Sequence, residues 1–175
     1  MSRNEKNKSA RRMADKKWFI VMAAVIVCFA FGPPVAGAGT TWLQRQKLLA
    51  SDGAAVDFFG CSDSIRGDYA IAGADYDDDK GANSGSAYIF RWDGTAWVQQ
   101  QKLLASDGAA GDCFGGSVSI SGDLAIVGAY GDDSDRGSAY IFKRDGTTWV
   151  QQQKLIASDG AAKDYFGYPV SISGD

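Results

Sequence analysis

Residues 102–114 read KLLASDGAAGDCF, and residues 154–166 read KLIASDGAAKDYF. Ten of these 13 positions are identical. Each stretch lies inside a longer pattern that begins at Trp42, Trp97 and Trp149, with spacings of 55 and 52 residues. Self-similarity at such a period is typical of a repeat architecture, in which each copy folds as one supersecondary unit.

The three-residue difference between the first two copies falls in one segment, residues 74–85 against residues 129–137. A length change confined to one segment favours a loop between strands of a common framework. The composition agrees, since the chain has 22 Gly and Glu5 is the one Glu among its 21 acidic residues. Asp and Gly favour turns, so the sequence predicts an all-β protein.

The second copy predicts four strands, at residues 114–121, 124–129, 138–143 and 149–157. The dipeptide Asp145-Gly146 predicts a two-residue hairpin. The second and third strands are apolar on both faces, whereas the last is polar, with three Gln and Lys154. A polar strand with a lysine is suited to the outer edge of a sheet. Four such strands in about 50 residues predict a β-propeller blade of four antiparallel strands.

Short Gly-containing motifs recur in register in every copy. They are Phe59-Gly60, Phe114-Gly115 and Phe166-Gly167, then Gly73-Ala74 and Gly128-Ala129, then Gly85-Ser86-Ala87-Tyr88 and Gly137-Ser138-Ala139-Tyr140. This pattern resembles the FG-GAP repeat, the blade unit of the integrin α-chain propeller and of many bacterial surface proteins. The resemblance implies repeats at residues 42–96 and 97–148 and a truncated one at residues 149–175.

The sequence departs from the integrin pattern in two respects. Asp75 and Tyr130 stand where the family's motif continues with Pro. The integrin-type calcium loop between Phe-Gly and Gly-Ala is also absent, because tight turns such as Ser121-Gly122-Asp123 fill that interval. The copies therefore look closer to bacterial repeats without that loop.

The copies make two complete blades plus flanking strands, which is a partial propeller. Propellers close with about four to eight blades, and FG-GAP propellers usually have seven. We therefore expect a fragment of a longer propeller, or a piece that associates with further blades or with itself. Open blade faces would expose apolar surface and favour such association.

Residues 1–38 have the three parts of a secretory signal peptide. Residues 1–17 carry seven basic side chains, residues 18–31 are an unbroken apolar run, and Ala36-Gly37-Ala38 is a small-residue cleavage site. Fourteen apolar residues are fewer than the roughly 20 that span a bilayer, which favours cleavage after Ala38. The alternative is an uncleaved anchor at residues 18–38. Either way we expect an extracellular or cell-surface protein.

Composition excludes several function classes. The chain has no His, so Ser-His-Asp and Cys-His catalysis and HExxH zinc sites are absent. The formal charge is −3, and residues 39–175 hold 11 basic and 19 acidic side chains, a net of −8. Such a balance disfavours nucleic-acid binding and suits an exported protein or a cation binder.

The Asp-rich segments after Gly-Ala are the candidate metal sites. Their carboxylates are Asp75, Asp77, Asp79, Asp132, Asp133 and Asp135. Alternating or clustered Asp residues supply the oxygen ligands that Ca²⁺ prefers. Lys80, however, stands where a calcium loop has Gly, and no Glu follows at the twelfth position. The alternative interpretation is a solvated Asp-rich turn.

Three other features have competing interpretations. Arg66-Gly67-Asp68 matches an integrin-recognition tripeptide, but its equivalents are Ser-Gly-Asp, so a hairpin turn is favoured over adhesion. Cys61 and Cys113 are a candidate disulfide in an exported protein, yet they are not equivalent in the repeat, which favours two buried thiols. Lys102 and Lys154 are predicted as edge charges.

The leading functional hypothesis is a binding or adhesion module that contacts protein or carbohydrate through its blade loops, with Ca²⁺ as its candidate ion. The alternatives are part of a polysaccharide-degrading propeller enzyme and a purely structural repeat. The sequence predicts no catalytic residue and no organic cofactor, because it has no His and no recognisable catalytic constellation. A non-enzymatic role is therefore favoured.

Overall fold

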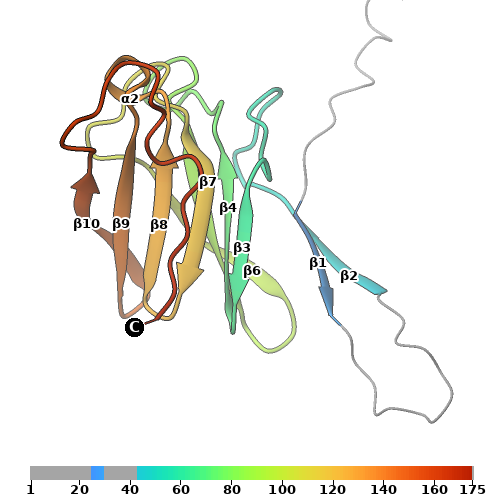
Figure 1. Ribbon diagram of the computed structural model, residues 1–175. Helices are drawn as coiled ribbons and strands as arrows, with labels where there is room; N and C mark the ends of the chain where they lie inside the picture. Colours follow the sequence, from blue (N-terminus) through green and yellow to red (C-terminus); the bar gives the residue numbers. More distant parts are fainter. Residues whose placement is uncertain (1–24, 30–42, 175) are drawn as a thin grey trace, which may run out of the picture.

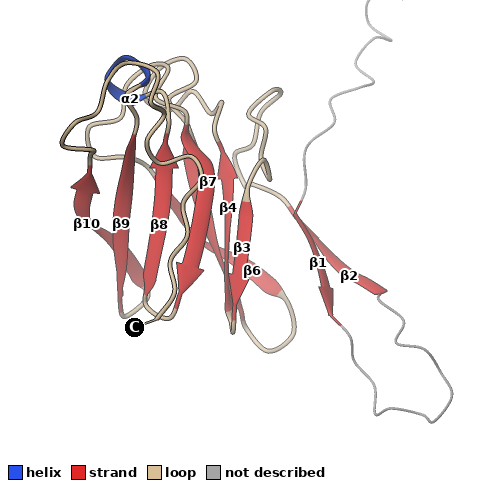
Figure 2. Cartoon of the chain, viewed as in Figure 1, coloured by secondary structure: helices blue, strands red, loops and turns tan. Residues whose placement is uncertain are grey.

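The computed structural model describes residues 25–29 and 43–174, and two four-stranded antiparallel sheets dominate it (Figures 1 and 2). Each sheet is a meander in which sequential strands pair. The first contains β3 (Asp63–Arg66), β4 (Tyr69–Ala74), β5 (Ser86–Trp92) and β6 (Trp97–Leu103). The second contains β7 (Phe114–Ser121), β8 (Leu124–Ala129), β9 (Ser138–Asp145) and β10 (Thr148–Leu155). Among the described residues, the one helical element is α2, the short turn Asp132–Asp135.

The all-β prediction and the blade-like sheets are confirmed. Strands β7 and β8 have the predicted bounds, and the polar strands β6 and β10 lie at sheet edges as expected. One hairpin differs, because Asp145 pairs with Thr148 and the two-residue loop is Gly146-Thr147. Gly146 has a φ of 60°, so the glycine takes the first loop position, where hairpin turns need a positive φ.

The two sheets pack face to face, with β7 of the second sheet against β3 and β4 of the first. Ile71, Ile89 and Leu103 from the first sheet share one buried cluster with Val118 and Val127 from the second. A second cluster lies on the other face of the first sheet and includes Leu48, Tyr88 and Trp97. Burial on both faces explains why the middle strands are apolar throughout.

Glycines allow the backbones of consecutive repeats to approach closely. A Cβ atom placed on Gly73 would lie 1.9 Å from the carbonyl oxygen of Gly115, and one on Gly128 would lie 1.9 Å from that of Gly167. Gly115 has a φ of 97°, which L side chains rarely adopt. The Gly-Ala motif of one repeat therefore packs directly against the Phe-Gly motif of the next. This close packing explains why both motifs contain glycine.

Glutamine side chains join the outer strands of consecutive repeats. The Gln46 amide donates to the Trp97 carbonyl at 2.8 Å and accepts from the Trp97 N–H at 2.8 Å. Gln101 forms the same pair with Trp149, at 2.8 and 2.7 Å. The sequence predicted only a polar edge for these strands, because side-chain pairing across blades leaves no periodic signal within one blade.

Most of the predicted signal peptide lies outside the described residues. Within it, Val25–Phe29 forms strand β1, which pairs with β2 (Leu43–Leu48). The register repeats that of β5 with β6, including a bulge after Val27 that matches the one after Ile89. Cleavage after Ala38 would therefore remove the partner strand of β2. No helix in the described ranges is long and apolar enough to cross a membrane.

The two ends of the sheets differ in their connections (Figure 1). One end, here called the turn end, has the two-residue hairpins that contain Gly67, Gly122 and Gly146. Arg66-Gly67-Asp68 belongs there, since Arg66 pairs with Tyr69 across a tight turn as predicted. The opposite end, here called the loop end, consists of residues 49–62, 75–85, 104–113, 130–137 and 156–168. All predicted metal ligands fall at the loop end.

Candidate functional site

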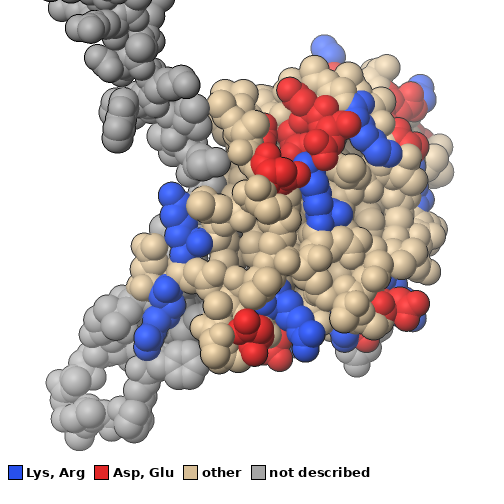
Figure 3. All heavy atoms as spheres, turned by 180° about the vertical axis from the view of Figure 1, so that it is seen from behind, with Lys and Arg blue, Asp and Glu red and all other residues tan. Residues whose placement is uncertain are grey.

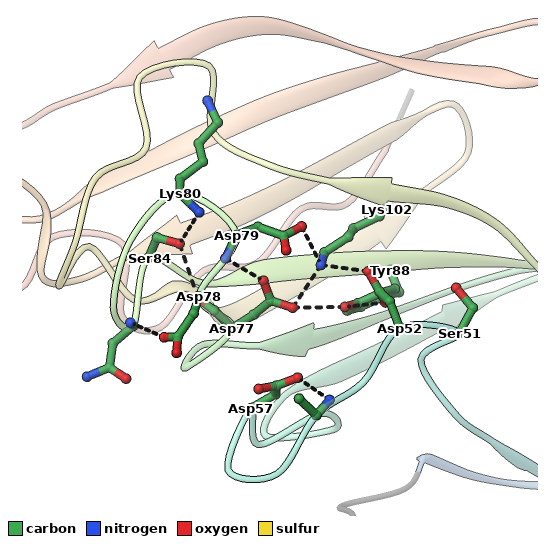
Figure 4. A network of polar contacts seen from close by, with 12 residues as sticks. Ser51, Asp52, Asp57, Asp77, Asp78, Asp79, Lys80, Ser84, Tyr88 and Lys102 are labelled. Carbon is green, nitrogen blue, oxygen red and sulfur yellow. Dashed lines mark hydrogen bonds and ion pairs between the residues drawn. The ribbon is translucent and has the colours of Figure 1, made fainter.

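Acidic side chains gather with lysines at the loop end (Figure 3). Asp77 is its most buried carboxylate, with 3 % of the residue exposed. It follows β4, and its N–H is bonded to the carbonyl of Ala74, which turns the chain over the end of the sheet. This turn points the Asp77 side chain at Lys102 on the outer strand β6 (Figure 4).

The Lys102 ammonium group is the centre of this cluster. Its Nζ atom lies 2.9 Å from Asp52 Oδ2, 2.8 Å from Asp77 Oδ2 and 2.6 Å from Asp79 Oδ2. The ring centroid of Tyr88 is 5.3 Å from the same nitrogen. The Tyr88 hydroxyl is also within 3.0 Å of Asp52 Oδ1 and 3.1 Å of Asp77 Oδ2. Each of the three N–H donors of the ammonium group can therefore bond to a carboxylate, and the nitrogen also lies over an aromatic ring.

The second blade repeats this arrangement. Lys154 Nζ lies 2.7 Å from Asp107 Oδ2 and 2.5 Å from Asp132 Oδ2, and 5.4 Å from the ring centroid of Tyr140. The Tyr140 hydroxyl donates to Asp107 Oδ1 at 3.0 Å. These residues are the repeat equivalents of those around Lys102. Lys102 and Lys154 lie on the edge strands β6 and β10 as predicted, but their ammonium groups bind carboxylates of the loop end, which the sequence did not predict.

The electrostatics of the two clusters follow from these contacts. Burial alone would lower the pKa of Lys102, but bonds to Asp77, Asp79 and Asp52 outweigh it and raise that pKa. Burial alone would raise the pKa of Asp107, but the bond from Lys154 reverses this and lowers it. Burial raises the pKa of Tyr140 to about 12. The pKa of Lys154 is raised in the same way, so Lys154 and Asp107 keep their ordinary charges at neutral pH and their ion pair persists there.

The six predicted metal ligands do not converge on one point. Asp77, Asp79 and Asp132 surround lysines, and Asp133 pairs with Arg136 at 3.0 Å. The Asp135 carbonyl accepts from the N–H groups of Lys163 and Tyr165. Within the described residues, no group of three or more His, Cys, Asp or Glu is arranged to hold a metal ion. Calcium binding stays a prediction, and it would require the lysines to leave their carboxylates.

Lys80 anchors the longer loop of the first blade. Its Nζ donates to the carbonyls of Ala105 at 2.7 Å and Ser106 at 2.9 Å. The loop thereby ties itself to the segment that follows β6. The sequence identified Lys80 only as a misfit in a calcium loop, because a long-range bond to a backbone carbonyl has no sequence signature.

Asp75 lies apart from the other five predicted metal ligands and lines a hollow of about 580 Å³. Three tyrosines, Tyr130, Tyr165 and Tyr168, line the same hollow, together with Cys61. The ring centroid of Tyr130 is 6.3 Å from that of Tyr165 and 5.4 Å from that of Tyr168. The Tyr130 hydroxyl approaches Asp75 Oδ2 at 3.4 Å. The sequence did not predict a site at this hollow.

A signal for the hollow was nevertheless present in the sequence. Cys61, Gly116 and Tyr168 are one equivalent position in the three repeats, and Asp75 and Tyr130 are another. These positions differ between copies, while the motifs beside them are the same. Variation at equivalent positions that face one hollow is what loops on a common scaffold show when they carry binding specificity.

The two cysteines Cys61 and Cys113 are free thiols, so the disulfide does not form here. Cys113 is buried as predicted, but Cys61 is exposed, which corrects the expectation for that residue. The Cys61 sulfur lies 3.5 Å from the Gly115 carbonyl oxygen. The protein packed around this sulfur, and then the Asp75 charge, raise the pKa of the thiol to about 12. The thiol stays protonated at neutral pH, where it is a weak nucleophile.

Comparison with protein families agrees with this architecture. The FG-GAP repeat model matches residues 42–90, 97–142 and 149–175, which make up more than half of the chain. The chain belongs to the FG-GAP repeat family. Each matched segment begins at one of the three repeat tryptophans. No curated protein matches the chain significantly.

Proposed function

We propose that this protein is an exported, non-catalytic binding module whose loop end contacts a protein or carbohydrate ligand. The observation that carries the proposal is the tyrosine-lined hollow, whose lining differs between equivalent positions of otherwise matching repeats. A rigid repeat framework below variable loops is a common basis of recognition. Fold alone does not establish function, so the proposal depends on this site.

The chemistry of the hollow supports binding rather than turnover. Its tyrosines offer broad apolar faces with polar hydroxyl tips, and such residues are enriched where proteins bind ligands. Tyr168 is 62 % exposed and Tyr165 is 41 % exposed, so their surfaces are open to a partner. Residues 1–38, with their basic start and apolar run, support export of the module.

The test is a binding screen with matched variants. Labelled protein is applied to an array of glycans and to intact cells, as native protein and as Tyr168→Ala. Val150→Ala, which removes an exposed apolar side chain from β10 away from the hollow, is the control. The proposal expects binding that Tyr168→Ala weakens at least about fivefold and that Val150→Ala leaves unchanged. Equal binding by all three proteins, or no binding, would contradict it.

Export is tested separately. The source cells are fractionated, and the mass and N-terminus of the product are measured. A product that begins at Gly39 and lies outside the cytoplasm is the expected result. An uncleaved product in the membrane fraction would support the anchor alternative, and a cytoplasmic product would refute export.

A further inference from the structure

The protein holds an ammonium group with a tyrosine and aspartates in two places. Lys102 lies over the Tyr88 ring beside Asp77, and Lys154 lies over the Tyr140 ring beside Asp132. In both blades the tyrosine hydroxyl also donates to a carboxylate that binds the lysine, since Tyr88 bonds to Asp77 at 3.1 Å and Tyr140 bonds to Asp107 at 3.0 Å. Each lysine cation is therefore stabilised by both the carboxylate charge and the aromatic face.

Tyr130 and Asp75 form a third pair of this kind, joined by the same hydroxyl-to-carboxylate contact. No ion pair found between described side chains includes Asp75. Its carboxylate is half-buried, and this burial raises its pKa. A neighbouring cation would lower that pKa, as Lys154 does for Asp107.

The walls of the hollow fit a compact cation. The Tyr130 ring is inclined at 66° to Tyr165 and at 59° to Tyr168, so the three rings form a corner instead of a flat platform. Asp164 is a second carboxylate in the lining, and the lining contains no Lys or Arg among the described residues. A negative, aromatic corner favours an alkylated ammonium group over a neutral or anionic one.

We propose that the hollow lined by Tyr130, Tyr165, Tyr168 and Asp75 binds an organic ammonium group, as carried by small quaternary amines or by a lysine side chain. This inference rests on the proposed binding function and names its ligand chemistry. Asp75 supplies the charge, Tyr130 positions that carboxylate and offers a ring face, and Tyr168 closes the corner from the third repeat.

The test uses two probes of equal shape. Choline carries a quaternary ammonium group, and 3,3-dimethyl-1-butanol is its neutral isostere. Each is titrated into the purified protein at constant ionic strength, and tyrosine fluorescence and NMR shifts are followed. We expect saturable binding of choline and at least about fivefold weaker binding of the isostere, since the cation–π and carboxylate attractions need the charge.

Variants place the binding at the hollow. Asp75→Asn and Tyr168→Ala are each expected to weaken choline binding at least about fivefold. Asp145→Asn makes the same carboxylate-to-amide change at the turn end and is expected to leave it unchanged. Unaltered near-ultraviolet circular dichroism of each variant would confirm that the fold is kept.

The source of the ammonium group is decided by a further comparison. Nα-acetyl-lysine methylamide and its trimethylated form are titrated beside choline. Tighter binding of the lysine probes would indicate a protein ligand, and tighter binding of choline a small amine. Equal binding of choline and its isostere, or full choline binding by Asp75→Asn, would overturn the inference.

Failure of this inference is distinguishable from failure of the proposed function. Chitotetraose and cellotetraose are titrated in the same experiment. If a saccharide binds and Tyr168→Ala abolishes that binding while choline does not bind, the ammonium inference is wrong and the binding function stands. If the array, the cells and all of these probes give no binding at the loop end, both are wrong.

Discussion

The inner strands of the two blades, β3 and β7, are equivalent in sequence but differ in environment. Strand β7 is buried along nearly its whole length, whereas β3 is largely exposed. On one side β7 contacts β3, where the Ile120 N–H donates to Ser64 Oγ at 3.3 Å. On its other side the third repeat contacts β7, where the Ile172 N–H donates to Ser119 Oγ at 3.2 Å.

This difference arises because burial of an inner strand comes from the neighbouring repeat. Ile65 and Ile120 are the same repeat position, yet 47 % of Ile65 and 4 % of Ile120 are exposed. A single repeat therefore cannot bury its own inner strand, as in other repeat proteins. Substitutions at equivalent positions of the two blades test whether the two inner strands differ in this way in solution.

The largest effect is expected from Gly73→Ala. The added Cβ would lie 1.9 Å from the Gly115 carbonyl oxygen, which belongs to backbone and cannot move aside cheaply. We expect a loss of at least about 3 kcal/mol in the free energy of unfolding, measured by urea denaturation. Gly94→Ala, in an open turn with a φ of 102°, is the control and should cost about 1–2 kcal/mol. Equal losses would show that the repeats do not interlock there.

The next effect compares the equivalent isoleucines directly. Ile120→Ala removes buried methyl groups and should cost about 2–4 kcal/mol, because a cavity remains. Ile65→Ala removes exposed groups and should cost less than about 1 kcal/mol. Both values are measured by urea denaturation under the same conditions. Similar costs at the two positions would mean that β3 is covered as well as β7 in solution.

A smaller effect is expected from the lysine clusters. Lys102→Met leaves the buried Asp77 without its cation and should cost about 2 kcal/mol. Lys154→Met should cost less, since Lys154 binds two carboxylates whereas Lys102 binds three.

Thermal unfolding of the native protein and of Lys102→Met, with and without Ca²⁺, tests calcium binding at these clusters. Because the lysine ammonium groups already occupy the space between these carboxylates, we expect Ca²⁺ to change the melting temperature of the native protein little and that of Lys102→Met more. A large Ca²⁺ effect on the native protein would contradict this.

The smallest effect is expected from Asp107 and Asp75, whose contributions to the free energy of unfolding depend on pH in opposite ways. The pKa of Asp107 is lowered on folding, so its stabilisation is present above the unfolded pKa near 4 and is lost as pH falls through the folded value. The pKa of Asp75 is raised, so its contribution is present below pH of about 4 and is lost as pH rises through the folded value. At neutral pH, Asp107→Asn should therefore destabilise and Asp75→Asn should stabilise, each by less than about 1 kcal/mol. Effects of the same sign would contradict the assignment.

Much of the fold could be predicted because it repeats along the chain. The register of the Phe-Gly and Gly-Ala motifs and the alternation of apolar strands with Asp-Gly turns indicate blades from the amino-acid sequence alone. The site was harder to predict. Asp75, Asp77 and Asp79 alternate like calcium ligands, yet Lys102, 25 residues beyond Asp77, occupies the space between two of them. The glutamine pairs with Trp97 and Trp149 were missed for the same reason, since partners about 50 residues apart leave no local pattern.

Hydrogen–deuterium exchange of the native protein compares the amides of residues 114–121 with those of residues 63–66 under one set of conditions. We expect the amides of β7 to exchange at least about a hundredfold more slowly than those of β3, because β3 covers one side of β7 and the third repeat covers the other. In Gly73→Ala the protection of β7 should fall toward that of β3. Equal exchange of the two strands in the native protein would contradict the claim that the neighbouring repeat provides the burial.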